Sequence, residues 1–282
     1  MLDKKILICS TIRNVEKDLK IFFKKIDDLT NNFKEYFIIL VESNSSDNSI
    51  EKANDFLKKR NGIVITKKLD EKLYRTQRLE SCRNEYLNYI RNNNYLSKFD
   101  FLIVMDADNM NNSLKLNTLI NSISNIEWNA IFANQKFLYY DIWTLRIKNY
   151  LEEDCFKKIK YEANKNKNNN LKKIFYKNFT KFFFIKKNFK DRYIKVTSAF
   201  GGFGIYKLDK VLNCNYDSKE GSQCEHVGLN ECLNEKYGNL FIDTKLINSL
   251  GFSKHTINGI LCSIFNFISK RFLIKLHENI KN

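Results

Sequence analysis

Short, continuous apolar runs alternate along the first part of the chain with segments in which apolar residues recur every three or four positions. Runs of this length predict buried β-strands, and the wider spacing predicts helices with one apolar face. The predicted strands are residues 4–11, 36–43, 62–68 and 99–108, and the predicted helices are residues 15–33, 49–60 and 78–91. Strands that alternate with helices indicate a mostly parallel sheet covered by helices on both faces.

The pattern changes after Asn112. Helical spacing returns at residues 114–124 and 224–238, and apolar runs predict strands at 130–141 and 239–248. The sequence Gly201-Gly202-Phe203-Gly204 does not fit a phosphate-binding loop. We interpret it as a tight turn that lets the backbone approach a sugar or acceptor, with an ordinary packing turn as the alternative.

Polar residues collect where three of the predicted strands end, at 10–13, 42–47 and 106–108. Ligands of open α/β sheets bind beyond the carboxyl ends of the strands, so these three segments are expected to share a site. Asp106 and Asp108 are two residues apart on an extended chain, which points both side chains the same way. Their oxygens suit Mg²⁺ or Mn²⁺. Alternatively, an aspartate in this position caps the next helix or closes a turn.

These segments resemble motifs of the GT-A glycosyltransferases. VESNSSDNS resembles their V-D-D-G-S-x-D segment, IVMDADNMN matches their metal-binding DxD, and RLESCRNEYL resembles the helix before it. ANQKFLYYDIWTLR, SAFGGFGIYK and CEHVGLNECLNEKYGNLFIDTKLIN resemble later motifs of polysaccharide-type enzymes, among them the capsule-associated mannosyltransferase group. The resemblance covers roughly residues 5 to 250 and implies a Rossmann-like, three-layer α/β/α fold with a C-terminal acceptor-side region.

The resemblance also implies an organisation and an activity. Residues 1–256 would form the GT-A domain, with a nucleotide-sugar half (1–112), an acceptor half (113–256) and an insertion at 157–192, followed by an amphipathic tail at 257–282. The implied reaction moves a hexose from a UDP- or GDP-sugar to a glycan, glycoprotein or lipid-linked acceptor in polysaccharide biosynthesis. Mn²⁺ or Mg²⁺ would assist it.

The same resemblance assigns roles to individual residues. Asp106 and Asp108 would hold the metal, with His226 or His255 as a third ligand, and Glu225 or Asp141 would act as the catalytic carboxylate on the acceptor side. Ser43 stands where the family has a second acid, and Glu225-His226 stands where Glu-Asp is commoner. The donor would contact Thr11, Arg13, Glu42, Ser43, Asp47, Arg78 and Arg83.

Each of these assignments has a structural alternative. The two arginines of the third predicted helix can belong to a solvated helix face. Glu225 can stabilise the start of a helix, and Asp141 can make an ordinary structural hydrogen bond. A lone histidine is more often a structural or surface residue than a metal ligand.

The net charge of +16 is concentrated in one segment. Residues 157–195 contain fourteen Lys or Arg and two acids, which gives +12, so the rest of the chain carries only +4. Aromatic residues are interleaved with these lysines: Phe175, Tyr176, Phe179, Phe182, Phe183 and Phe184. The segment is either an excursion of biased composition, a contact with an anionic membrane surface or lipid-linked acceptor, or, least favoured, a site for single-stranded nucleic acid.

Seven scattered cysteines without a CxxC pair predict neither a disulfide framework nor a zinc site. No run reaches 18 apolar residues, and the N-terminal segment has no signal-peptide pattern. We therefore expect a cytoplasmic protein, with peripheral contact at the inner face of a membrane through 157–192 or through the predicted apolar helix 257–276.

Two other functions compete with the glycosyltransferase hypothesis. A nucleotidyltransferase acting on a sugar phosphate shares the nucleotide-binding sheet, but it usually has a glycine-rich loop after the first strand, and CSTIRNVEKD contains no glycine. A non-enzymatic, basic nucleic-acid-binding protein predicts salt-sensitive RNA or DNA binding that is lost when 157–192 is deleted.

Overall fold

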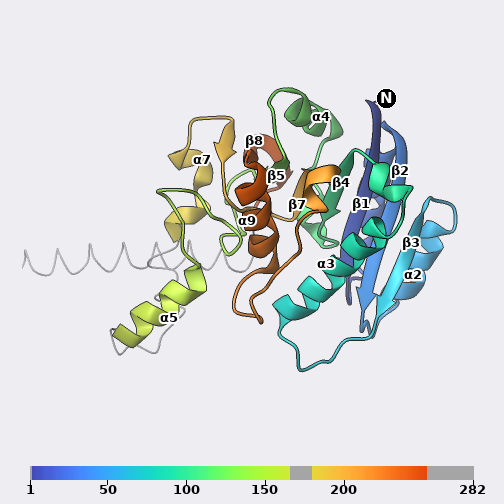
Figure 1. Ribbon diagram of the computed structural model, residues 1–282, viewed down its shortest axis with the longest axis horizontal. Coiled ribbons are helices and arrows are strands. Elements are labelled where there is room, and N and C mark those ends of the chain that lie inside the picture. Colours follow the sequence, from blue (N-terminus) through green and yellow to red (C-terminus); the bar gives the residue numbers. More distant parts are fainter. Residues whose placement is uncertain (1, 166–179, 253–282) are drawn as a thin grey trace, which may run out of the picture.

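An eight-stranded sheet forms the centre of the chain in a computed structural model, which describes residues 2–165 and 180–252. The strand order is β3-β2-β1-β4-β7-β5-β8-β6 (Figure 1). The strands are β1 Leu2–Ile12, β2 Phe33–Ser43, β3 Gly62–Lys67, β4 Phe101–Met105, β5 Ala130–Gln135, β6 Tyr193–Lys195, β7 Phe203–Lys207 and β8 Leu240–Ser249.

The sheet is mostly parallel, as the sequence predicts. β1 pairs in parallel with β2 and β4, β2 with β3, and β5 with β8. β7 runs antiparallel between β4 and β5, and β6 runs antiparallel to β8. Because β1, β2 and β4 point the same way, their carboxyl ends meet at one edge of the sheet, which is where the site lies.

Helices cover both faces of the sheet. Alternate strand residues face opposite sides, so Leu7 of β1 packs in the same core as Cys82 of α3, whereas Ile8 packs in the same core as Phe22 of α1. α3 and α9 cover the first face, and α1, α2 and α4 cover the second. The α-helices are α1 Leu19–Thr30, α2 Ser49–Leu57, α3 Arg75–Arg91, α4 Leu116–Ser124, α5 Cys155–Lys165, α7 Ile185–Asn188, α8 Leu208–Val211 and α9 Glu225–Tyr237. The 3₁₀ helices are η1 Leu96–Lys98, η2 Asn109–Asn111 and η3 Thr180–Phe183.

Some predicted boundaries were wrong, each for a local reason. β4 ends at Met105 rather than at residue 108, because the Asp106 N–H donates to the Gly202 carbonyl and Asp108 then starts η2. α3 begins at Arg75 rather than at residue 78. There the Gln77 side chain accepts the Tyr74 N–H, which closes the first turn.

Two aromatic residues of the basic segment belong to the hydrophobic core. Phe182 and Phe183, two of the aromatic residues for which contact with a membrane or with nucleic acid was an alternative, are buried in the core. Their apolar rings pack there with neighbours such as Tyr150. Residues 166–179 and the predicted helix 257–276 lie outside the described residues. Within the described ranges, no helix combines the length and the apolar character needed to cross a bilayer.

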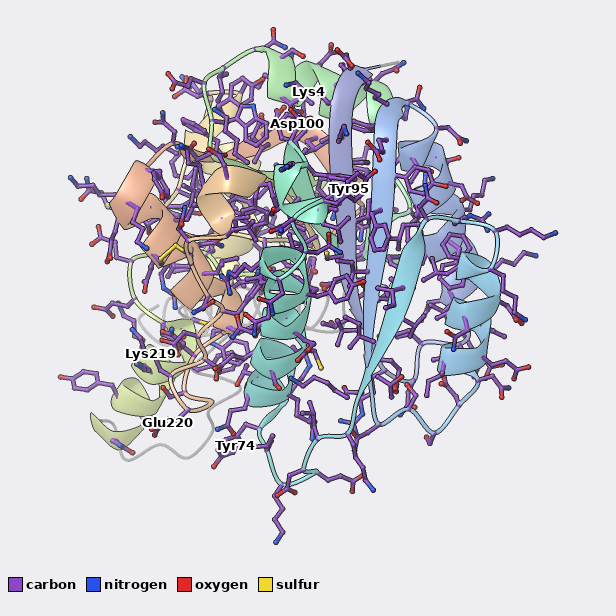
Figure 2. All side chains as sticks on the ribbon, turned by 45° about the vertical axis from the view of Figure 1, so that its right-hand side comes forward. Lys4, Tyr74, Tyr95, Asp100, Lys219 and Glu220 are labelled. Atoms are coloured by element: carbon purple, nitrogen blue, oxygen red, sulfur yellow. A yellow bond between two sulfur atoms is a disulfide. The ribbon has the colours of Figure 1, made fainter. Side chains whose placement is uncertain are left out.

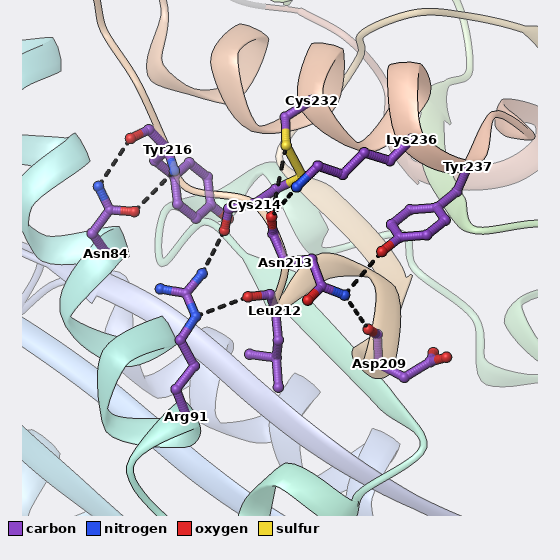
Figure 3. Close-up of a disulfide and its surroundings, with 10 residues drawn as sticks. All are labelled: Asn84, Arg91, Asp209, Leu212, Asn213, Cys214, Tyr216, Cys232, Lys236 and Tyr237. Carbon is purple, nitrogen blue, oxygen red and sulfur yellow. Dashed lines mark hydrogen bonds between the residues drawn. A yellow bond between two sulfur atoms is a disulfide. The ribbon is translucent and has the colours of Figure 1, made fainter.

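Cys214 and Cys232 form a disulfide, which corrects the prediction that the chain contains none (Figure 3). The bond joins the segment after α8 to helix α9. Two side-chain bonds from α3 hold the same segment, since Arg91 donates to the carbonyls of Leu212 and Cys214. The sequence gives no signal for this pair, because the proximity of two cysteines 18 residues apart depends on how α9 packs.

Candidate active site

A cavity of about 530 Å³ opens at the carboxyl ends of β1, β2 and β4. Its walls come from the β1–α1 loop, the start of α3, the DxD segment, the chain after β5 and the start of α9. The cavity brings together ten residues that the sequence predicts for the site: Thr11, Arg13, Ser43, Arg78, Arg83, Asp106, Asp108, Asp141, Glu225 and His226.

The glycine turn bonds the backbone of Asp106 and the carboxylate of Asp141. The Gly201 N–H donates to Oδ2 of Asp141 at 3.1 Å, and the Gly202 carbonyl accepts the N–H of Asp106 at 3.0 Å. Both glycines have positive φ, 64° and 83°. A Cβ on Gly202 would lie 3.0 Å from Oη of Tyr140. The turn therefore needs glycine and fixes the DxD segment relative to Asp141.

Arg83 bonds two of the acids that line the cavity, Asp106 and Glu225. Its Nη2 donates to Asp106 at 3.1 Å and its Nε donates to Glu225 at 3.1 Å, while Nη1 has no hydrogen-bond partner among the described residues. Burial opposes the charge, but Tyr86, Glu225 and Asp106 outweigh it and raise the pKa of Arg83 well above its ordinary value. Arg83 is thus a permanent cation that holds Asp106 and Glu225 in place.

Asp108 has the capping role that its position allows, and it also lines the cavity. Its Oδ1 accepts the Met110 N–H at 3.1 Å and so caps η2. The side chain is nevertheless exposed at the cavity. Loss of hydration, followed by the neighbouring charge of Asp106, raises the pKa of Asp108 to about 7. A cation between the two carboxylates would remove this repulsion, so the pair fits a divalent metal.

Asp141 is the other unusual acid. Its side chain is partly exposed and lines the cavity beside Tyr140 and Thr144. Burial of the group is the main cause that raises its pKa to about 6, although hydrogen bonds from Thr144 and Gly201 oppose the shift. A carboxylate with a raised pKa in a cavity is a candidate general base.

Three arginines line the cavity: Arg75 and Arg78 come from α3, and Arg13 comes from the β1–α1 loop. In the part of the chain that the structure describes, none of them forms an ion pair. Arg75 is close enough for its charge to lower the pKa of Asp108. Unpaired guanidinium groups beside a metal-binding pair suit the oxygens of a diphosphate.

Glu42 and Asp47 do not line the cavity. Glu42 is fully buried and accepts the Ser45 N–H at 2.6 Å. Asp47 accepts the backbone N–H groups of Glu16 and Ser49, which joins the β1–α1 loop to the start of α2. Both acids therefore hold loops next to the cavity and do not line it.

His226 lines the cavity but is buried at the start of α9. Its ring stacks on Phe200, with ring centroids 3.7 Å apart, and neither ring nitrogen has a hydrogen-bond partner among the described residues. Burial and then the charges of Arg83 and Arg75 lower its pKa well below 6.5. In residues 2–165 and 180–252 no three His, Cys, Asp or Glu side chains are grouped for a metal. His255 lies outside the described residues.

Arg75 and Trp143 line the cavity, and the sequence reasoning assigned neither a role. Arg75 stands one turn before Arg78 on the same helix, so the i, i+3 spacing was the signal that could have found it. Trp143 lies two residues after Asp141, and only the packing of the chain after β5 brings it to the cavity.

Neither a protein-family model nor the sequence of a curated protein matches this chain. Solved structures resemble it. S. aureus TarS has a TM-score of 0.50 at 10% identity over 92% of this chain and 39% of TarS. The mannosyltransferase PcManGT of Pyrobaculum calidifontis, solved with GDP-Man and Mn²⁺, has a TM-score of 0.49 at 8% identity over 90% of this chain and 59% of PcManGT.

The fold is thus the GT-A fold of nucleotide-sugar glycosyltransferases, as the sequence motifs predict. The chain spans less than two thirds of these neighbours, 39% of full-length TarS and 57% of its 1-349 fragment. The likeness concerns the fold, and the chemistry follows from the side chains of the site.

Proposed function

We propose that this protein is a divalent-metal-assisted glycosyltransferase that moves a hexose from a UDP- or GDP-sugar to a hydroxyl of a glycan or glycoconjugate. One observation carries the proposal: two adjacent carboxylates and three unpaired arginines share one cavity at the carboxyl edge of a GT-A sheet. Carboxylates attract a hard cation, and arginines attract the diphosphate that such a cation would bridge.

The donor would occupy the side of the cavity formed by β1, β2 and α3. Thr11 and Ser43 stand at the ends of β1 and β2, where a nucleoside binds in open α/β sheets. Arg13, Arg75 and Arg78 would contact the diphosphate. Glu42 and Asp47 support these loops from behind without touching the donor.

Asp106 and Asp108 would hold Mn²⁺ or Mg²⁺, because these hard cations prefer carboxylate oxygens. When bound, such a cation supplies charge neutralisation for the departing diphosphate. Arg83 keeps the carboxylate of Asp106 in position through its Nη2.

Asp141 is our choice for the general base. The acceptor oxygen bonds to the anomeric carbon as the bond from that carbon to the diphosphate oxygen breaks, and the electron pair leaves with the diphosphate. The hydroxyl proton passes to the Asp141 carboxylate. Glu225 is held by the permanently charged Arg83 at 3.1 Å, so we assign it the positioning of Arg83 instead.

The test is release of nucleoside diphosphate from a panel of UDP- and GDP-sugars with Mn²⁺ or Mg²⁺. We expect Asp108→Asn to lower turnover by about 100-fold or more, because it removes a metal ligand. Asp100→Asn is the matched control, since Asp100 lies just before β4, at the end of the molecule away from the site, beside Lys4 (Figure 2). Equal turnover by the wild type and Asp108→Asn would refute the metal assignment.

A further inference from the structure

Trp143 lines the cavity two residues after Asp141, and its ring is held from outside the cavity. The indole Nε1 donates to Oδ2 of Asp154 at 2.9 Å. The ring is partly exposed. A tryptophan whose N–H is already paired keeps its apolar ring face for another partner.

The anchor of this tryptophan is itself rigid. Asp154 is buried, pairs with Nη2 of Arg146 at 3.1 Å, and accepts the N–H groups of Phe156 and Lys157 at the start of α5. Together with the indole N–H of Trp143, four donors thus fix the carboxylate of Asp154. Because Asp154 cannot turn away without losing them, the indole that it holds is preorganised.

Phe156 of α5 completes the support. Its ring meets the ring of Trp143 edge to face, with centroids 4.9 Å apart and planes at 79°. Helix α5 lies at the same end of the molecule as the first turns of α3 and α9 (Figure 1). The first turn of α5 therefore supports the wall of the cavity.

The cavity has two chemically different sides. Arg13, Arg75 and Arg78 make one side cationic, whereas Asp141 and Trp143 come from the chain after β5. A diphosphate suits the first side. The second side offers a carboxylate beside an apolar aromatic face, which suits a neutral ring that carries hydroxyl groups.

We infer that Trp143 is the platform on which a pyranose ring of the acceptor packs, so that one of its hydroxyl groups reaches Asp141. The C–H groups of a sugar ring carry a small positive charge and are attracted by the negative face of the indole. This inference rests on the proposed function and specifies its acceptor as a neutral sugar at the point of attack.

The chain contains only two tryptophans, which makes the platform directly measurable. Trp128 is buried and donates to the Ile123 carbonyl at 2.9 Å, so it should not respond to a sugar. Intrinsic fluorescence is titrated with methyl glycosides of glucose, galactose, mannose and N-acetylglucosamine, in the presence of UDP or GDP and Mn²⁺. We expect at least one glycoside to change the emission of the wild type and of Trp128→Phe, and none to change that of Trp143→Phe.

No response to any glycoside, or the same response in Trp143→Phe, would overturn the inference. A kinetic measurement checks it independently, since Trp143→Ala should raise the Michaelis constant for a sugar acceptor on the order of tenfold. Tyr161→Ala is the matched control: it removes an exposed aromatic ring from α5 and should leave that constant unchanged. Failure of the proposed function would appear differently, as no release of diphosphate by the wild type.

Discussion

Asp106 and Asp108 have different surroundings although only Ala107 separates them. Asp106 is held by Nη2 of Arg83, while Asp108 caps η2 and stays exposed. One carboxylate is therefore fixed by a cation and the other is the more open to a ligand. Loss of hydration, and then the neighbouring charge of Asp106, raises the pKa of Asp108 to about 7.

Asp141→Asn should lower transfer by about 10²- to 10⁴-fold, the usual contribution of a general base. In the wild type, transfer should rise as the pH increases through about 6, because the ionised carboxylate accepts the proton. The variant should lack this step in its pH–rate profile. A variant that kept the step would exclude Asp141 as the base.

Asp141→Asn should raise the free energy of unfolding above pH 6, although it lowers the rate of transfer. The pKa of Asp141 is raised from 3.8 to about 6 in the folded protein, so the folded state retains a proton that the unfolded state has already released. Its ionisation therefore lowers the free energy of unfolding as the pH rises from about 4 to 6. Above pH 6, Asp141→Asn should melt at a higher temperature than the wild type, and below pH 4 the difference should disappear.

Glu225→Gln separates positioning from catalysis. It weakens the contact that Nε of Arg83 makes, so we expect a lower rate. If Glu225 only positions Arg83, the pH step near 6 that belongs to Asp141 should persist in this variant. Loss of that step in Glu225→Gln, with its retention in Asp141→Asn, would reverse the two roles.

At the scale of elements, the turn before β7 decides whether the site forms. Gly202→Ala should lower the free energy of unfolding by about 1–2 kcal/mol, because alanine is strained at φ 83°. It should also reduce transfer, since the turn bonds both Asp106 and Asp141. Gly238→Ala is the matched control: φ is 63°, but nothing lies within 4 Å of the added Cβ. Equal losses of transfer in both variants would contradict this role of the turn.

The disulfide should matter for stability rather than for chemistry. Replacing Cys214 and Cys232 by serine should lower the free energy of unfolding by about 3 kcal/mol, as expected for a closed loop of this length. Transfer should persist, because Arg91 still holds the segment and Tyr86 still bonds Tyr216. Urea denaturation of the variant, and of the wild type with reductant, measures the change. An unchanged midpoint would show that the bond does not stabilise the fold.

Most of the longer strands and helices could be predicted from the sequence because each carries its own periodicity, whereas β6, β7, α5, α7 and α8 were not predicted. The contacts that build the site could not be predicted. Gly201 bonds Asp141 from 60 residues away, and Arg83 bonds Glu225 from 142 residues away. Glu42 shows the limit of motif reasoning, since its place at a strand end is correct but its side chain is buried away from the cavity.

At the scale of the whole molecule, one sheet joins the two sides of the cavity. β1, β2 and β4 end at the edge that carries the cavity, and β7 lies antiparallel beside β4, which brings the glycine turn and Asp141 to the DxD segment. The high net charge of the chain is not needed for this site, where four acids and four arginines face one another. Those arginines are Arg13, Arg75, Arg78 and Arg83.

The most direct test of the central claim is the melting temperature with UDP, GDP and CMP, each with and without Mn²⁺. A ligand that binds only the folded state raises that temperature. The proposed site predicts that UDP or GDP raises it much more with Mn²⁺ than without, and that Asp108→Asn loses this difference while Asp100→Asn keeps it. A wild type that responds to no nucleotide, or responds equally with and without the metal, would contradict the account.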